Sequence, residues 1–181
     1  METKFFAKDG TEFTVRDLKK SDAKLVFDYF GKLRKEKHPG LPRRKKNTLK
    51  GIREWVNNNV DGSKKRRDIS LVAEKDEVIV GTCELSYLYK DLNSRHISYY
   101  STSILSSERS KGLGTFMFKE QIRLIKKRIP NFKIIELTVN GDNKRAIKLY
   151  RKWGFKKVAE VPKRIKIDNK YYSDVIMHYK L

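Results

Sequence analysis

The feature that most constrains the fold is a glycine loop between a strand-like run and a helix-like run. A β-branched and aromatic run ending at Leu105 leads into SERSKGLGTFMFKE, residues 107–120. After Gly112, apolar residues recur at three- and four-residue spacing to about Arg128, which predicts a helix. A strand, a glycine loop and a helix in this order require a fold that mixes both element types.

The rest of the chain alternates between the same two patterns. Upstream, the periodicity predicts a hairpin-like start, a helix over 22–36 with Ser21 as N-cap, a shorter helix over 48–60, and a strand meander over 69–105. Downstream, 133–181 predicts a strand, a short helix and two final strands. We therefore expect an α+β (mixed α/β) fold.

Composition limits the class of protein. The 181 residues show no repeat or low-complexity linker, so we expect a single domain over 1–181. Cys83, the one cysteine, lies in an apolar strand pattern, which favours a buried structural thiol and excludes a disulfide framework. His38 and His178 lack a metal-like spacing partner, so no metal is expected. No uncharged apolar run approaches about 18 residues, which predicts a soluble, cytoplasmic protein without a membrane segment.

The charge is strongly basic. Lys and Arg number 43 against 22 Asp and Glu, a formal net charge of +21. Two clusters, RRKK at 43–46 and KKRR at 64–67, lie in turn-rich surroundings. Two interpretations of these clusters are open: they are solvated surface loops, or they dock an acidic macromolecule.

The glycine loop has the requirements of an anion site. Gly112 and Gly114 remove Cβ atoms where a ligand would approach, and the following helix start offers unpaired N–H groups with about half a positive charge. Arg109 and Lys111 add positive charge beside it, as a pyrophosphate would need. No lysine follows the second glycine, which excludes a Walker loop, and Met117 stands where a dinucleotide fingerprint needs a third glycine. A tight turn without a ligand remains the alternative.

Two motifs resemble signatures of the GNAT superfamily of N-acetyltransferases. Residues 109–114, RSKGLG, match Arg/Gln-x-x-Gly-x-Gly/Ala, and LTVNGDNKRAIKLYRKWGFKKV resembles Asn-x-x-Ala-x-x-x-Tyr-x-x-x-Gly-Phe. The resemblance is clear over about 95–160, the cofactor-binding core of such enzymes. The helical region at about 22–60 is where they vary with the substrate.

The resemblance implies a fold, a reaction and a cosubstrate. The fold would be the GNAT-type acyl-CoA N-acyltransferase fold, a central, mostly antiparallel twisted sheet flanked by helices. The activity would be transfer of an acetyl group from acetyl-CoA to a primary amine of a small-molecule or protein acceptor, by direct attack in a ternary complex. Homodimers are common among members.

The resemblance also assigns roles to particular residues. Backbone amides of the first signature would grip the pyrophosphate, the preceding strand would lie against the pantetheine arm, and an N–H near Leu105 would face the thioester carbonyl as oxyanion donor. Tyr150 would protonate the departing thiolate, although a core tyrosine is the alternative. The implied cofactor-binding residues are Ile104, Leu105, Arg109, Ser110, Lys111, Gly112, Leu113, Gly114, Thr115, Asn143 and Tyr150.

The residues leave the general base open. An amine with a pKa near ~10.4 is mostly ammonium at neutral pH, so its deprotonation costs roughly 4 kcal/mol before attack. Glu84 and Glu136, on strand-like runs, are equal candidates for the base, and a water relay without an essential carboxylate is a third option. For each carboxylate, an ion pair or a sheet-edge role is the alternative.

A second class of function stays open. The charge of +21 and the two basic clusters are also typical of a nucleic-acid or ribosome-binding module that keeps the same fold without turnover. Such a module would bind nucleic acid with a steep salt dependence, whereas an enzyme would consume acetyl-CoA.

Overall fold

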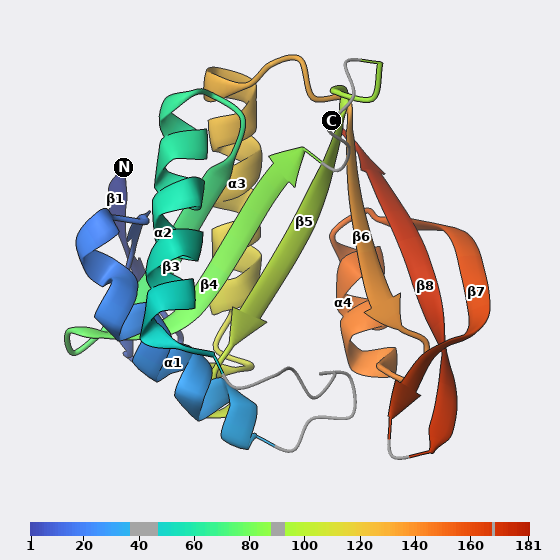
Figure 1. Ribbon diagram of the computed structural model, residues 1–181, viewed down its shortest axis with the longest axis horizontal. Coiled ribbons are helices and arrows are strands. Elements are labelled where there is room, and N and C mark those ends of the chain that lie inside the picture. Colours follow the sequence, from blue (N-terminus) through green and yellow to red (C-terminus); the bar gives the residue numbers. More distant parts are fainter. Residues whose placement is uncertain (37–46, 88–92, 168) are drawn as a thin grey trace.

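The computed structural model describes residues 1–36, 47–87, 93–167 and 169–181 (Figure 1). Their strands form one eight-stranded sheet in the order β1-β2-β3-β4-β5-β6-β8-β7. The strands are β1 (Glu2–Phe6), β2 (Glu12–Asp17), β3 (Ile69–Lys75), β4 (Val78–Tyr87), β5 (Ile97–Ile104), β6 (Ile134–Asn140), β7 (Lys156–Ile167) and β8 (Lys170–Lys180). The helices are α1 (Ala23–Lys35), α2 (Leu49–Lys64), α3 (Leu113–Arg128) and α4 (Lys144–Lys152).

Helices cover both faces of the sheet (Figure 1). α1 and α2 lie across β3 and β4 on one face, and α3 and α4 lie on the other. In the described part of the chain, no helix is both long enough and apolar enough to cross a membrane. Helices on both faces explain why β3 reads as an almost continuous buried run.

The mixed α+β fold and the strand meander are confirmed. Every pairing in the sheet is antiparallel except β5 with β6, which are parallel and joined through α3. Parallel neighbours need a crossover, and the helix after the glycine loop supplies it. The loop therefore lies at the carboxyl end of β5, where the crossover to β6 begins.

The start of α1 differs from the expectation. Ser21 does not cap the helix, because residues Lys20–Asp22 form a 3-10 turn and α1 begins at Ala23. Asp22 is buried and accepts a hydrogen bond from the Lys19 N–H at 2.8 Å. Ser21 and Asp22 are adjacent and both polar, so the helical periodicity does not show that Asp22 is the buried one.

Strands β5 and β6 separate soon after they begin to pair. Their parallel pairing covers only Ile97–Tyr99 with Ile134–Glu136, whereas β5 stays paired with β4 as far as Ile104. Figure 1 shows β5 and β6 diverging toward the end of β5 that leads into the glycine loop. The divergence leaves the facing backbone edges of both strands without ladder partners, beside the start of α3.

Candidate functional site

The loop before α3 has the backbone geometry of an anion site. Ser110, with φ +69°, and Gly112, with φ +87°, lie in the left-handed region. A loop that passes in and out of this region can turn successive N–H groups toward a common side. Among the described residues, none accepts a hydrogen bond from the N–H groups of residues 110–115. The loop and the start of α3 therefore offer unpaired donors and partial positive charge.

The two cations of the loop are engaged elsewhere. Arg109 donates from Nε to the Ile104 carbonyl oxygen at 2.8 Å and from Nη2 to Glu36 at 2.5 Å. Lys111 Nζ lies 3.1 Å from Glu108 Oε2 and 3.3 Å from an oxygen of Asp9. Carboxylates thus offset the charge that the sequence led us to expect at the anion site.

The two glycines of the motif have different surroundings. A Cβ atom on Gly112 would meet only Phe5, at 3.5 Å, so this residue keeps the open side that we expected. A Cβ atom on Gly114 would lie 3.3 Å from Cδ1 of Ile104. Gly114 therefore lets α3 pack closely on β5, and the space left by its missing side chain is already filled.

The N–H of Leu105 is not free. It donates to the Val80 carbonyl oxygen at 2.9 Å, extending the β4–β5 ladder. The predicted oxyanion donor near Leu105 is therefore better supplied by a neighbouring residue. Alternation in an antiparallel ladder turns the N–H of neighbouring Ile104 away from β4, and so toward the gap between β5 and β6.

Tyr150 lies where β5 and β6 separate. Its ring packs against Trp153 and Phe155, with centroids 5.5 and 5.8 Å away. Burial, then the nearby Tyr99, raise the pKa of Tyr150 to about 12. Tyr99 itself bridges the two strands through a 2.9 Å hydrogen bond to Thr138. Among the described residues, none hydrogen-bonds to the hydroxyl of Tyr150, whose side chain is half-buried.

Two predicted cofactor contacts have internal partners. The side-chain oxygen of Asn143 accepts from the Ala146 N–H at 3.1 Å and caps α4. The Thr115 hydroxyl accepts from the indole N–H of Trp153 at 3.1 Å, which ties α3 to the end of α4. Asn143 keeps its amide donors and Thr115 keeps its hydroxyl proton, so each can still donate to a ligand.

Glu84 lies on the face of the sheet that α1 covers. It shares this face with Thr82, beside Tyr29 of α1, whose hydroxyl bonds to both the carbonyl and hydroxyl oxygens of Ser103 at 2.8 and 2.7 Å. Burial, then lesser causes that include the charge of Glu84, raise the pKa of Tyr29. The Glu84 side chain is half-buried on this face.

Glu136 has a partner that the sequence did not reveal. Its Oε2 lies 2.7 Å from Nε2 of His178, which stands opposite it in the β6–β8 register. His178 was expected to lack a metal-like spacing partner, and the structure adds an ion-pair contact with Glu136 that the spacing did not indicate. The two residues are 42 positions apart, and only the strand register brings them together.

Other groups near the site were also missed. Glu36, at the end of α1, accepts from the Ser106 N–H at 2.7 Å and from Arg109, so it fastens α1 to the glycine loop. Arg145, in the first turn of α4, donates to the Ser110 hydroxyl at 2.5 Å. Neither contact follows from local periodicity, because each joins segments at least 35 residues apart.

The basic clusters are only partly described. Lys64 ends α2, and the four residues 64–67 are all exposed, as expected of a solvated cluster. The cluster at 43–46 and His38 lie outside the described residues.

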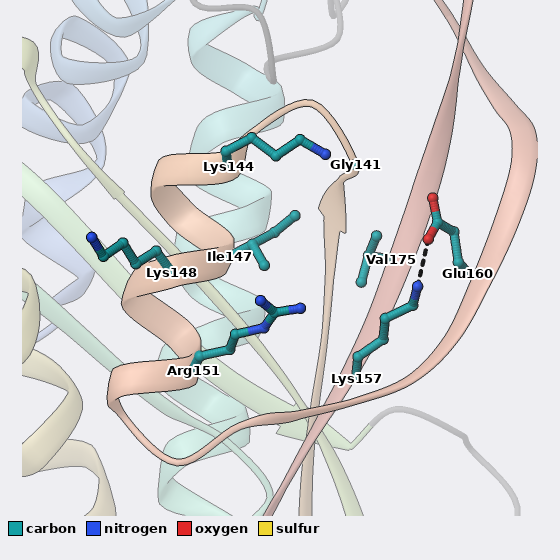
Figure 2. Close-up of a pocket in the computed structure, with 8 residues that line it drawn as sticks. All are labelled: Gly141, Lys144, Ile147, Lys148, Arg151, Lys157, Glu160 and Val175. Carbon is teal, nitrogen blue, oxygen red and sulfur yellow. Dashed lines mark hydrogen bonds and ion pairs between the residues drawn. The ribbon is translucent and has the colours of Figure 1, made fainter.

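A further cationic cavity lies between α4 and the β7–β8 pair. The residues that line it include Lys144, Lys148 and Arg151 of α4, and Figure 2 shows Lys144 and Arg151 extending toward the side where Lys157 and Glu160 of β7 lie. Its volume is about 470 Å³, and Lys157 pairs with Glu160 at 2.6 Å. One carboxylate among four cations leaves this cavity, here called the α4 groove, with a net positive charge.

The comparisons with known proteins identify the family. The sequence model of the Acetyltransferase (GNAT) family matches residues 29–155, more than half of the chain, so the chain belongs to this family and is an acyltransferase. No curated protein matches the sequence.

Solved structures share the fold. A GNAT-family acetyltransferase from Streptococcus pneumoniae is 19% identical, with a TM-score of 0.83, over 93% of this chain and 99% of that one. A ribosomal-protein-S5-alanine acetyltransferase from Vibrio fischeri is 21% identical, with a TM-score of 0.83, over 99% and 96%. A putative acetyltransferase from Salmonella typhimurium, solved with its cofactor acetyl-CoA, is 16% identical, with a TM-score of 0.80, over 93% and 94%.

The residues present fit the family's cosubstrate, acetyl-CoA. The unpaired N–H groups of 110–115 suit a diphosphate, and the unpaired edges of β5 and β6 suit an extended arm that carries amide groups. The two features adjoin at the end of β5, so one elongated ligand can use both.

Proposed function

We propose that this acetyltransferase acts on a primary amine by direct attack within a ternary complex. Acetyl-CoA supplies the acetyl thioester. The ammonium first loses one proton, and the neutral amine then forms the new N–C bond as the C–S bond breaks. The nitrogen gives up a second proton, and the departing sulfur gains one. The observation that carries the proposal is the Tyr150 hydroxyl, which has no hydrogen-bond partner among the described residues and lies near the end of the β5–β6 pairing. It stays protonated at neutral pH and can donate its proton to the departing sulfur.

Glu84 is the better candidate for the proton acceptor. Glu136 faces Tyr99, the last residue of β5 that pairs with β6, and its Oε2 lies 2.7 Å from Nε2 of His178. Glu84 lies on β4, opposite Ser101 of β5, which is beyond the last residue of β5 that pairs with β6. Its side chain is on the sheet face that α1 covers with Tyr29. A half-buried carboxylate there can attract an ammonium group and accept its proton directly or through water.

We expect Glu84→Gln to lower turnover by about 10²- to 10⁴-fold, because the amide cannot accept the proton. Glu77→Gln, an exposed change of the same kind in the β3–β4 turn, is the matched control and should leave turnover unchanged. Steady-state rates of thiol release measure both. A larger loss in Glu136→Gln would instead assign the base to the Glu136–His178 pair, and full activity in both site variants would indicate a water relay.

We further propose that the acceptor amine belongs to an acidic macromolecule. The net charge of +21, the exposed cluster at 64–67 and the α4 groove all favour a negatively charged partner. The fold also occurs in enzymes named for ribosomal proteins, so a macromolecular acceptor is compatible with it.

Acceptor peptides matched in length and N-terminal residue, but acidic or basic in the remainder, test this proposal. We expect the acidic peptide to react with the higher kcat/KM and to lose that advantage as salt rises, because screening removes the attraction. Spermidine is included as a small cationic acceptor. If it reacts best, the acceptor class is wrong. If no acceptor reacts, and RNA binds with a steep salt dependence, transfer itself is contradicted.

A further inference from the structure

The anion site needs a cation that its own loop does not supply. Arg109 is paired with Glu36 at 2.5 Å, and Lys111 lies between Glu108 and Asp9. A cation already held by a carboxylate contributes little net charge to a ligand nearby. The unpaired N–H groups of 110–115 alone would then face a doubly charged diphosphate.

Arg145 is placed to supply that charge. It lies in the first turn of α4, is exposed, and reaches the glycine loop, where Nη2 donates to the Ser110 hydroxyl at 2.5 Å. No described carboxylate pairs with it. The first turn of α4 holds no acidic residue, so this guanidinium meets the positive end of the helix dipole uncompensated. An anion between the loop and α4 would offset both positive charges.

We propose that Arg145 is the guanidinium that binds the diphosphate of acetyl-CoA, together with the Ser110 hydroxyl and the amides of 110–115. The inference rests on the proposed function, because it requires acetyl-CoA as the ligand. A guanidinium presents planar, paired donors that match phosphate oxygens. Arg109, by contrast, acts through Glu36 and the Ile104 carbonyl to hold the loop in shape.

Isothermal titration of the whole chain tests the assignment without requiring turnover. Binding of acetyl-CoA is compared with binding of S-acetylpantetheine, which keeps the thioester arm but has no diphosphate. We expect Arg145→Gln to weaken acetyl-CoA binding about 10- to 150-fold, the loss of a charge-assisted hydrogen bond, and to leave S-acetylpantetheine binding unchanged. Arg145→Lys should fall between the two, since it keeps the charge and loses the paired donors.

Arg151→Gln is the matched control. This substitution removes a guanidinium from the same helix, but from the side that lines the α4 groove. The Arg151→Gln variant should bind acetyl-CoA as tightly as the unmodified chain does. Moderate salt screens nonspecific attraction of a polyanion to this basic protein. Equal affinities in Arg145→Gln and Arg151→Gln would overturn the assignment and leave the proposed function standing. Failure of the unmodified chain to bind acetyl-CoA would overturn both.

Discussion

Replacing Tyr150 with phenylalanine should lower turnover by about 10²- to 10⁴-fold and leave acetyl-CoA affinity nearly unchanged. The substitution removes one oxygen and keeps the ring that packs on Trp153 and Phe155. Because the hydroxyl has no partner among the described residues, its loss breaks no internal hydrogen bond and should not unfold the domain. Single-turnover rates at saturating acetyl-CoA report the chemical step most directly.

Tyr179→Phe is the matched control for this variant. Tyr179 packs on Phe155 in the same aromatic cluster, with centroids 5.5 Å apart, and has no role in the proposed chemistry. We expect it to retain full turnover. Because the pKa of Tyr150 is about 12, this tyrosine stays protonated near pH 10. The unmodified chain should therefore not lose activity there through ionisation of Tyr150. Equal turnover in both phenylalanine variants would mean that Tyr150 only fills the core.

Local patterns predicted the fold well, because hydrophobic periodicity and turn chemistry are properties of neighbouring residues. The strand–loop–helix junction at 107–120 is the clearest case, since buried Leu113, Met117 and Leu124 line one face of α3. The start of α1 was misplaced because Asp22, in the turn before the helix, is held by Arg16 of β2. A contact between elements leaves no mark on the spacing within either one.

The site was predicted in backbone terms and missed in side-chain terms. The glycine motif correctly indicated a loop with free N–H groups, because glycine at 112 directly permits φ +87°. The same motif could not show that Glu36 neutralises Arg109, or that Arg145 reaches Ser110. Those pairings depend on where distant segments meet, which neither charge counts nor motif spacing specify.

Asp22→Ala should destabilise the fold by about 3–5 kcal/mol, since it leaves a buried arginine partly unpaired. The Asp22 carboxylate accepts from both terminal nitrogens of Arg16, at 2.8 and 2.9 Å, and both side chains are buried. Arg16 also bonds to Glu74 at 2.7 Å, so one centre joins β2, β3 and the turn before α1. The hydrogen bond to Asp22 is the first cause of the raised pKa of Arg16.

Asp28→Ala provides the comparison that isolates burial. Asp28 pairs with Lys24 at 2.6 Å, a shorter distance than any in the Arg16 centre, but both side chains are exposed. Solvent screening limits the contribution of an exposed helix ion pair to the free energy of unfolding to about 0.3–0.5 kcal/mol. Urea unfolding of Asp28→Ala should therefore show a loss of stability no larger than this. If Asp22→Ala does not fold, Asp22→Asn, which can keep one hydrogen bond, gives a measurable intermediate loss. Losses of similar, small size in the Asp22 and Asp28 variants would show that Arg16 is held by Glu74 alone.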